Sequence, residues 1–182
     1  MKKSTTLTIT QASVVAAAYV LFTLPFAQFA YGPIQFRLAE ALTVLPALFP
    51  AAIPGLFLGC LLANLFNPNS LGLIDVIFGS LATLLAGLVT WKLSVVFRSA
   101  RPMVRRLVCL IPPVLFNALI VGTYLPFLLL EEGGRVTLAV AALNIASIGL
   151  SEAVVVYVIG LPLLTGLERR FHQVQQKPAN GV

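Results

Sequence analysis

Long apolar segments separated by short polar ones dominate the pattern along this chain. A helix needs about 20 mostly apolar residues to cross the roughly 30 Å of bilayer hydrocarbon. The apolar segments cover residues 9–29, 38–50, 54–66, 73–91, 107–130 and 136–167. They predict an all-α integral membrane protein, a single bundle of six transmembrane helices over residues 1–182, with no separate soluble domain.

The second and third segments, within residues 38–66, need a separate argument. This stretch is too long for one straight span and too short for two of standard length. Three prolines interrupt it, at Pro46, Pro50 and Pro54. Because proline breaks a helix, we predict two short helices joined by a tight turn between the last two prolines. Gly55 and Gly59 would then form a GxxxG face for close helix packing.

Composition supports the membrane interpretation. The chain has 182 residues, of which 59% are hydrophobic and 10% are charged, and its mean hydropathy is +0.98. Soluble domains carry about 25% charged residues, so most of this chain is expected to lie within the lipid bilayer. The net charge of +6 falls between apolar runs and not along one polar face. This placement favours membrane topology over nucleic-acid binding as the role of the charges.

The positive charges also predict an orientation. With six spans and a cytoplasmic N-terminus, the leader, the stretch 92–106 and the C-terminal tail all face the cytoplasm. These regions hold two, five and three of the twelve Lys and Arg residues, which leaves only Arg37 and Arg135 outside. Five spans would place the arginine-rich stretch outside, against the positive-inside rule. We therefore expect a multi-pass membrane protein with both termini cytoplasmic.

Arg37 and Glu40 lie three residues apart at the start of the second span. Helical spacing lets the two side chains meet on one face, and the first turn of a helix favours an anion. One interpretation is therefore a self-neutralised helix start. The other is the polar lip of a solute pocket, because charges within a membrane are costly without a partner or a function.

Further polar side chains interrupt the other apolar runs. The candidate substrate-binding residues are Arg37, Glu40, Asn64, Asn67, Asp75, Asn117, Tyr124, Asn144 and Glu152. Polar groups that converge from several helices of an apolar bundle are typical of a ligand site. Any single asparagine could instead form a hydrogen bond between helices.

The sequence contains none of the enzyme motifs that we sought. It has no G-x-S-x-G, no H-E-x-x-H and no nucleotide-binding P-loop. Cys60 and Cys109 lie inside apolar runs without the spacing of a metal site or a disulfide. We expect no enzymatic activity, no metal and no cofactor.

Three blocks of sequence carry a resemblance to a known family. They are QFRLAEALTVLP at 35–46, GCLLANL at 59–65 and DVIFGSLATL at 75–84, together with Glu152 and the stretch 157–163. In these blocks the chain resembles the QueT family, substrate-binding S-components of bacterial energy-coupling-factor (ECF) transporters. The resemblance covers roughly residues 8–167.

This resemblance implies a six-helix S-component fold and uptake of a queuosine precursor, a deazaguanine such as preQ1 or preQ0. It also implies association with a transmembrane T protein and two cytoplasmic ATPases. Ala12 and Ala16 are similar to the A-x-x-x-A motif by which S-components dock their T partner. Two alternatives are an S-component for another flat vitamin-like solute and a stand-alone small secondary transporter.

Glu152 is the residue that we expect to hold the purine edge. A guanine-type edge presents a ring N–H and an exocyclic amine in parallel, and a carboxylate can accept both. Glu152 lies about 15 residues into the sixth span, roughly 22 Å along it, near the middle of the bilayer. An unpaired carboxylate is costly there, so without ligand Glu152 is expected to be protonated or to be held by a neighbour such as Asn117.

Overall fold

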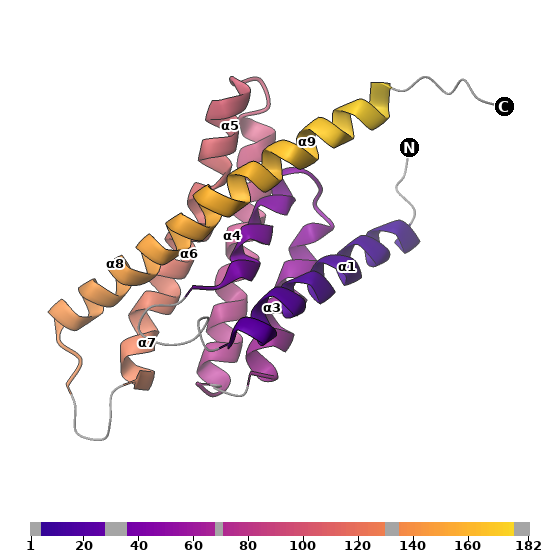
Figure 1. Cartoon of the computed structure of the whole chain (residues 1–182). Coiled ribbons are helices and arrows are strands. Elements are labelled where there is room, and N and C mark those ends of the chain that lie inside the picture. Colours follow the sequence, from indigo (N-terminus) through magenta and orange to yellow (C-terminus); the bar gives the residue numbers. More distant parts are fainter. Residues whose placement is uncertain (1–4, 28–35, 68–70, 130–134, 177–182) are drawn as a thin grey trace.

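A computed structural model describes residues 5–27, 36–67, 71–129 and 135–176 of the chain. Every regular element in these ranges is a helix, which confirms the all-α class. Figure 1 shows them as one bundle. The elements are α1 (Thr5–Thr23), η1 (Leu24–Phe26), η2 (Leu38–Ala47), α3 (Ala52–Leu65), α4 (Leu73–Val96), α5 (Pro102–Cys109), α6 (Ile111–Phe116), η3 (Asn117–Val121), α7 (Gly122–Leu129), α8 (Leu138–Val154), η4 (Val155–Gly160) and α9 (Leu161–Gln176).

Four helical segments in the described ranges are long and apolar enough to cross a membrane. They are Thr5–Phe26, Leu73–Val96, Pro102–Leu129 and Leu138–Phe171, and two shorter apolar helices, Leu38–Ala47 and Ala52–Leu65, accompany them. These six segments coincide with the six predicted ones, apart from their ends. Crossing by the two short helices and the cytoplasmic termini stay predictions.

The prediction was wrong at the ends of several segments. Helix α4 continues to Val96, so Lys92 is helical, and α5 begins at Pro102, so the arginines at 105 and 106 are helical too. The non-helical part of the arginine-rich stretch is therefore only 97–101. Long basic side chains at a helix end can reach the aqueous interface while their stems stay apolar, so charge alone marks the end of a helix poorly.

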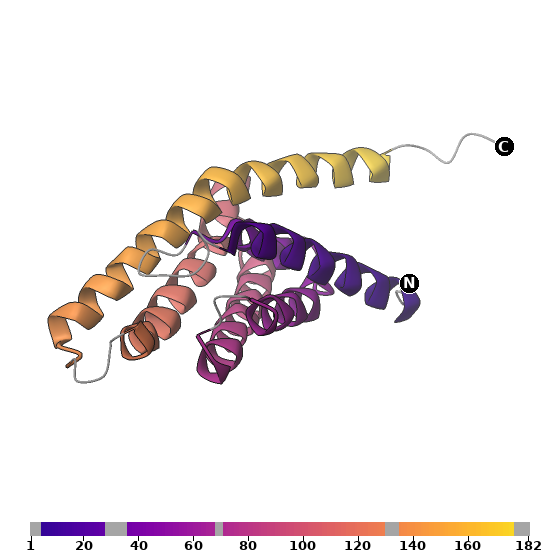
Figure 2. The same cartoon turned by 60° about the horizontal axis from the view of Figure 1, so that its bottom comes forward.

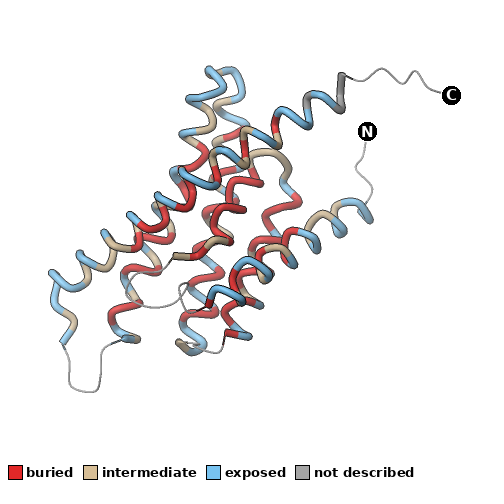
Figure 3. Tube along the Cα trace, in the orientation of Figure 1, coloured by how far each residue is buried: buried red, intermediate tan, exposed pale blue. Residues whose placement is uncertain are grey.

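The break after the second segment is confirmed. The chain leaves η2 at Ala47, turns, and enters α3 at Ala52. Element η2 is a tight 3-10 helix of ten residues, although the i, i+3 argument had assumed an α-helix. Such long 3-10 runs are uncommon and often mark a functional or strained segment. The eight residues from 39 to 46 are all buried, so η2 lies in the interior of the bundle (Figure 3).

Helices α1 and α3 pack backbone against backbone, as the GxxxG prediction required. A Cβ atom at Gly55 would lie 2.5 Å from the carbonyl oxygen of Ala12. At Gly59 it would lie 2.6 Å from Cβ of Tyr19 and 3.0 Å from the carbonyl oxygen of Ala16. Only glycine permits this approach, so the prediction is confirmed.

Two long helices each contain a π-helical segment. Element η3 joins α6 to α7, and η4 joins α8 to α9 into one long curved helix whose end extends beyond the bundle (Figure 2). Wide π turns often occur at functional sites. Asn117 is the first residue of η3, and Glu152 lies three residues before η4. Both π segments therefore adjoin candidate site residues.

Candidate functional site

All four acidic side chains in the described part of the chain are buried. Glu40, Asp75, Glu152 and Glu168 are each at most 6% exposed. Glu168 pairs with arginines near one end of the bundle, whereas the other three come from η2, α4 and α8 and take part in polar clusters with Arg37. Buried charges are costly unless they are paired and hydrogen-bonded, so the contacts of these three carboxylates define the candidate site.

The first cluster is built around Asp75, in the first turn of α4. The hydroxyl of Tyr124 on α7 donates a hydrogen bond to Asp75 Oδ1 at 2.6 Å. Arg37, just before η2, places Nη2 3.8 Å from the same oxygen. The other oxygen, Oδ2, is buried and has no hydrogen-bond partner among the described residues. Asp75 thus keeps one open acceptor.

Helix α3 reaches this cluster through Asn64. Its side-chain amide donates to the backbone carbonyl of Asp75 at 3.2 Å. Gly79, one turn further along α4, provides the space for this contact. A Cβ at Gly79 would lie 2.9 Å from Asn64 Nδ2 and 3.4 Å from the Tyr124 hydroxyl.

The second cluster joins the other two carboxylates through one amide. Nδ2 of Asn117 donates to Glu152 Oε1 at 3.1 Å and to Glu40 Oε2 at 3.4 Å. The hydroxyl of Tyr19 on α1 donates to Glu40 Oε1 at 2.5 Å. Glu40 thus accepts from two neutral donors, and its carboxyl group also shares a hydrogen bond with that of Glu152. The expectation that Asn117 holds Glu152 is confirmed.

A small internal cavity lies where the two clusters meet. Arg37, Glu40, Asn117, Val121, Ile148 and Glu152 line it, and its volume is about 10 Å³. That is room for about one water molecule, whereas pockets for small organic ligands occupy about 300–1,000 Å³. A planar bicyclic ligand could therefore enter only if neighbouring segments moved apart.

The charges suit a ligand that brings positive charge or hydrogen-bond donors. Three carboxylates and one guanidinium share this buried region, and the hydroxyl and amide groups around the carboxylates supply donors but no charge. Further N–H donors or a cation would improve the balance, whereas an anion would be disfavoured.

Arg37 and Glu40 each contact further side chains at this site. Both side chains line the cavity, but the ion pair described for Arg37 is with Asp75. Glu40 accepts hydrogen bonds from Tyr19 and Asn117 instead. Arg37 precedes η2 and has an extended backbone, so it does not lie on the helical face that the i, i+3 spacing assumed.

Two further candidates, Asn67 and Asn144, do not line the cavity and have no place in the hydrogen bonds given above. Asn67 is buried just after the end of α3. Asn144 lies on α8 about two turns before Glu152, and its side-chain oxygen is buried without a hydrogen-bond partner in the described ranges. Neither side chain contacts a carboxylate in the contacts described, so their assignment to the site stays a prediction.

Tyr19 is the site residue that sequence reasoning missed. It is fully buried, and it links α1 to Glu40. The available signal was a polar-tipped aromatic residue within an otherwise alanine-rich span, because a buried tyrosine hydroxyl usually finds a hydrogen-bond partner.

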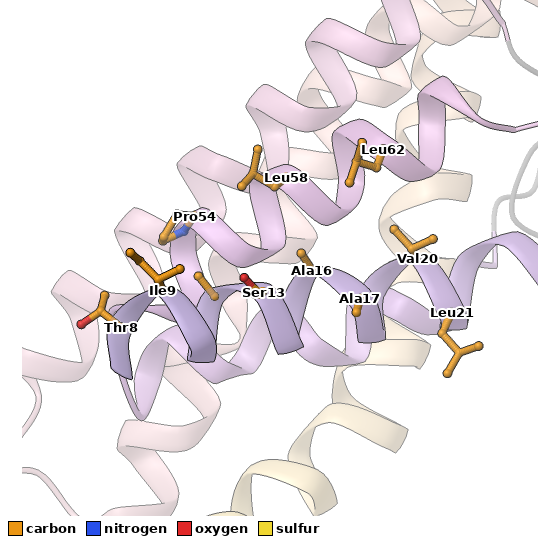
Figure 4. Close-up of a pocket in the computed structure, with 11 residues that line it drawn as sticks. Thr8, Ile9, Ser13, Ala16, Ala17, Val20, Leu21, Pro54, Leu58 and Leu62 are labelled. Atoms are coloured by element: carbon orange, nitrogen blue, oxygen red, sulfur yellow. The ribbon is translucent and has the colours of Figure 1, made fainter. Parts of the chain in front are cut away.

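A wide apolar surface groove runs between α1 and α3 (Figure 4). Its volume is about 870 Å³, and its lining residues are Thr8, Ile9, Ala12, Ser13, Ala16, Ala17, Val20, Leu21, Pro54, Leu58 and Leu62. Both predicted docking residues, Ala12 and Ala16, are among them. Their backbones also pack against the glycines of α3, whereas Ser13 and Ala17 are exposed in the groove.

The sequence of this chain matches a known protein family. The family model described as QueT transporter matches residues 9–169. The chain belongs to the QueT transporter family. The queuosine precursor transporter QueT of Lactococcus lactis subsp. cremoris (strain MG1363) is 38% identical to it over 86 residues. That match covers 46% of this chain and 49% of the relative, about half of each. No solved structure matches the chain.

The family is described as one of transporters. The family match extends over every described residue named in the two polar clusters. It therefore identifies the kind of protein to which the buried carboxylates belong, but it assigns no role to any one of them.

Proposed function

We propose that this protein is the substrate-binding S-component of an ECF-type importer that takes up a queuosine precursor, a deazaguanine such as preQ1 or preQ0. The observation that carries the proposal is the meeting of Glu40 and Glu152 through Asn117 beside an internal cavity. Buried carboxylates in an apolar bundle are costly unless they accept hydrogen bonds. A guanine-type edge supplies two parallel N–H donors that can satisfy them.

Within the site, Glu152 is the carboxylate best suited to the purine edge. Glu40 already accepts from Tyr19 and Asn117, and Asp75 accepts from Tyr124 beside Arg37. Glu152 accepts from Asn117 through Oε1 and shares a hydrogen bond with Glu40, and the two N–H donors of the ligand would replace the contact between the two carboxyl groups. Both N–H donors of the edge would then bind one carboxylate in a dry environment, where charge-assisted hydrogen bonds are strong.

Asp75 offers a place for a second polar group of the ligand. Its Oδ2 atom is buried without a hydrogen-bond partner in the part of the chain described. A cationic aminomethyl substituent, as in preQ1, would find a carboxylate oxygen there. A neutral nitrile substituent, as in preQ0, would not gain this contact.

Ligand entry requires that the cavity widen by more than an order of magnitude, from about 10 Å³ to the few hundred Å³ of a ligand pocket. The π-helical segments η3 and η4 lie next to Asn117 and Glu152. Because π turns are wider and less regular than α turns, these segments are where the two long helices can adjust. We expect α7 and α8 to move relative to η2 when ligand binds.

Energy for transport has to come from partner proteins in this scheme, because the sequence has no P-loop. The apolar groove between α1 and α3 is where the transmembrane T protein would dock, with two cytoplasmic ATPases bound to it. Small side chains along α1 permit close approach of another helix. The bilayer of the bacterial plasma membrane surrounds the rest of the bundle, with both termini in the cytoplasm.

Titration calorimetry on the purified protein tests the substrate assignment. We expect preQ1 and preQ0 to bind, and a deazapurine that lacks the exocyclic amine to bind at least ten-fold more weakly, because one charge-assisted hydrogen bond would be lost. Equal binding of the amine-free analogue would exclude the carboxylate-edge arrangement. Binding of a different flat solute, with no response to either precursor, would favour an S-component of another specificity.

A further inference from the structure

One end of the bundle carries a dense set of exposed basic side chains. Lys92, Arg98, Arg101, Arg169 and Arg170 are all exposed, and we refer to these five as the basic rim. The first three lie at the α4–α5 corner, and the last two lie on α9. In Figure 1 the α4–α5 corner and α9 share the upper part of the bundle.

Glu168 connects the two parts of the rim. It is buried, and it accepts a hydrogen bond from Arg106 Nε at 2.7 Å and another from Arg105 Nη2. One carboxylate therefore holds two guanidinium groups of α5 against α9, across 62 and 63 residues of sequence. A single negative charge between two positive ones leaves a net positive charge, so this cluster adds to the rim and does not neutralise it.

No acidic side chain balances the rim on the described surface. Each of the four described carboxylates is buried, so every exposed charged side chain in these ranges is basic. Apart from the rim, the exposed described charge is Arg135, which lies just before α8 at the other end of that long helix. The rim is thus a strongly positive surface at one end of an apolar bundle.

The rim also lies at the depth of a membrane interface. Trp91 precedes Lys92 at the end of α4 and is 37% exposed, and Phe171 follows Arg170 and is 49% exposed. Tryptophan is enriched at the level of lipid headgroups, and Trp91 therefore indicates the depth of the rim. Basic side chains at this depth would meet phosphate groups.

From this geometry we infer that the basic rim is a binding site for anionic phospholipid headgroups of the adjacent leaflet, such as phosphatidylglycerol. The chemistry is that of guanidinium on phosphate, which is charge-assisted and often bidentate. Each basic residue near an anionic membrane surface strengthens binding roughly five-fold. This inference is independent of the solute that the bundle carries.

The chain contains a single tryptophan, Trp91, so its fluorescence reports on the lipids next to the rim. The experiment places the protein in vesicles of phosphatidylcholine mixed with phosphatidylglycerol, one lipid or the other carrying brominated chains that quench tryptophan. Wild type should be quenched several-fold more effectively by brominated phosphatidylglycerol at equal fraction. The preference should fall as salt rises, because salt screens exposed charges.

The test variant is Arg98→Gln with Arg101→Gln, since both side chains are exposed and lie outside the contacts of Glu168. We expect this double variant to lose most of the several-fold preference, because each basic residue near an anionic surface strengthens binding. The matched control is Arg135→Gln, which removes an exposed arginine away from the rim and should leave the preference unchanged. Thermal unfolding of each variant shows whether the fold is retained.

Equal quenching by the two lipids in wild type would overturn the inference. So would a preference that the double variant and high salt leave intact. If wild type shows no lipid preference but the double variant no longer copurifies with an ATPase partner, the rim is a protein-docking surface, and the lipid assignment is wrong.

Discussion

Replacement of Glu152 by glutamine is the perturbation that the site geometry defines best. The two side chains have the same shape, so Asn117 can still donate to the retained oxygen at about its present distance of 3.1 Å. The change removes the negative charge and turns one acceptor into an N–H donor. In the proposed complex that donor faces a donor of the ligand.

The magnitude follows from what the ligand would lose. Breaking one side of a buried, charge-assisted hydrogen-bonded pair costs roughly 2–5 kcal/mol. That range corresponds to about 30-fold to several thousand-fold in affinity. The free energy of unfolding should change less than the free energy of ligand binding. Asn117 keeps an acceptor, and the substitution removes a buried like charge beside Glu40.

Calorimetry with preQ1 on wild type and Glu152→Gln measures this difference directly. The matched control is Glu168→Gln, which changes a carboxylate of equal burial that contacts Arg105 and Arg106 and not the cavity. It should lower thermal stability and leave affinity unchanged. If Glu152→Gln alters affinity by no more than a few-fold, Glu152 is structural, and the purine edge would belong to Glu40 or Asp75.

Three further substitutions test the surrounding structure. Tyr19→Phe removes the hydroxyl that donates to Glu40 at 2.5 Å; we expect a roughly five- to 100-fold loss of ligand affinity by calorimetry, and no change would make the contact irrelevant to binding. Gly79→Ala places a Cβ 2.9 Å from a buried asparagine amide and should lower both the melting temperature and affinity. Gly166→Ala, which meets nothing within 4 Å, should do neither, and similar results for the two would refute the packing argument. Ala17→Leu should abolish copurification with the T protein while affinity stays near normal, because this exposed residue lines the α1–α3 groove; unchanged uptake would show that partners dock elsewhere.

The sequence predicted those features that depend on hydrophobic length and on glycine or proline. The apolar runs gave the helical segments, the prolines between 46 and 54 gave the break before Ala52, and Gly55 with Gly59 gave the close approach of α1 and α3. Each of these three features follows from a local rule whose violation costs much free energy. Such features can therefore be predicted from a single sequence.

The contacts within the site were only partly predictable. Asn117 and Glu152 meet as expected because both lie deep in long spans whose depth can be counted. The partners of Arg37 and Glu40 depend on the 3-10 geometry of η2 and on how it packs against α1 and α4. Tertiary packing decides such pairs, and no spacing rule places Tyr19 beside Glu40 or Arg37 beside Asp75.

The ends of helices were predicted least well. Lys92 lies inside α4 although its charge suggested a loop. At a membrane interface a lysine can extend its head toward water from within a helix. Charge alone therefore does not locate the residue at which a helix ends.

Identification of the ligand that accompanies the protein through purification tests the central claim most directly. The protein would be produced in cells that make or are fed deazaguanine precursors, purified in mild detergent and analysed by native mass spectrometry. The account predicts one bound molecule per chain with the mass of preQ1 or preQ0, and its loss in Glu152→Gln but not in Glu168→Gln. A bound molecule without a guanine-type edge, or retention of the precursor by Glu152→Gln, would contradict it.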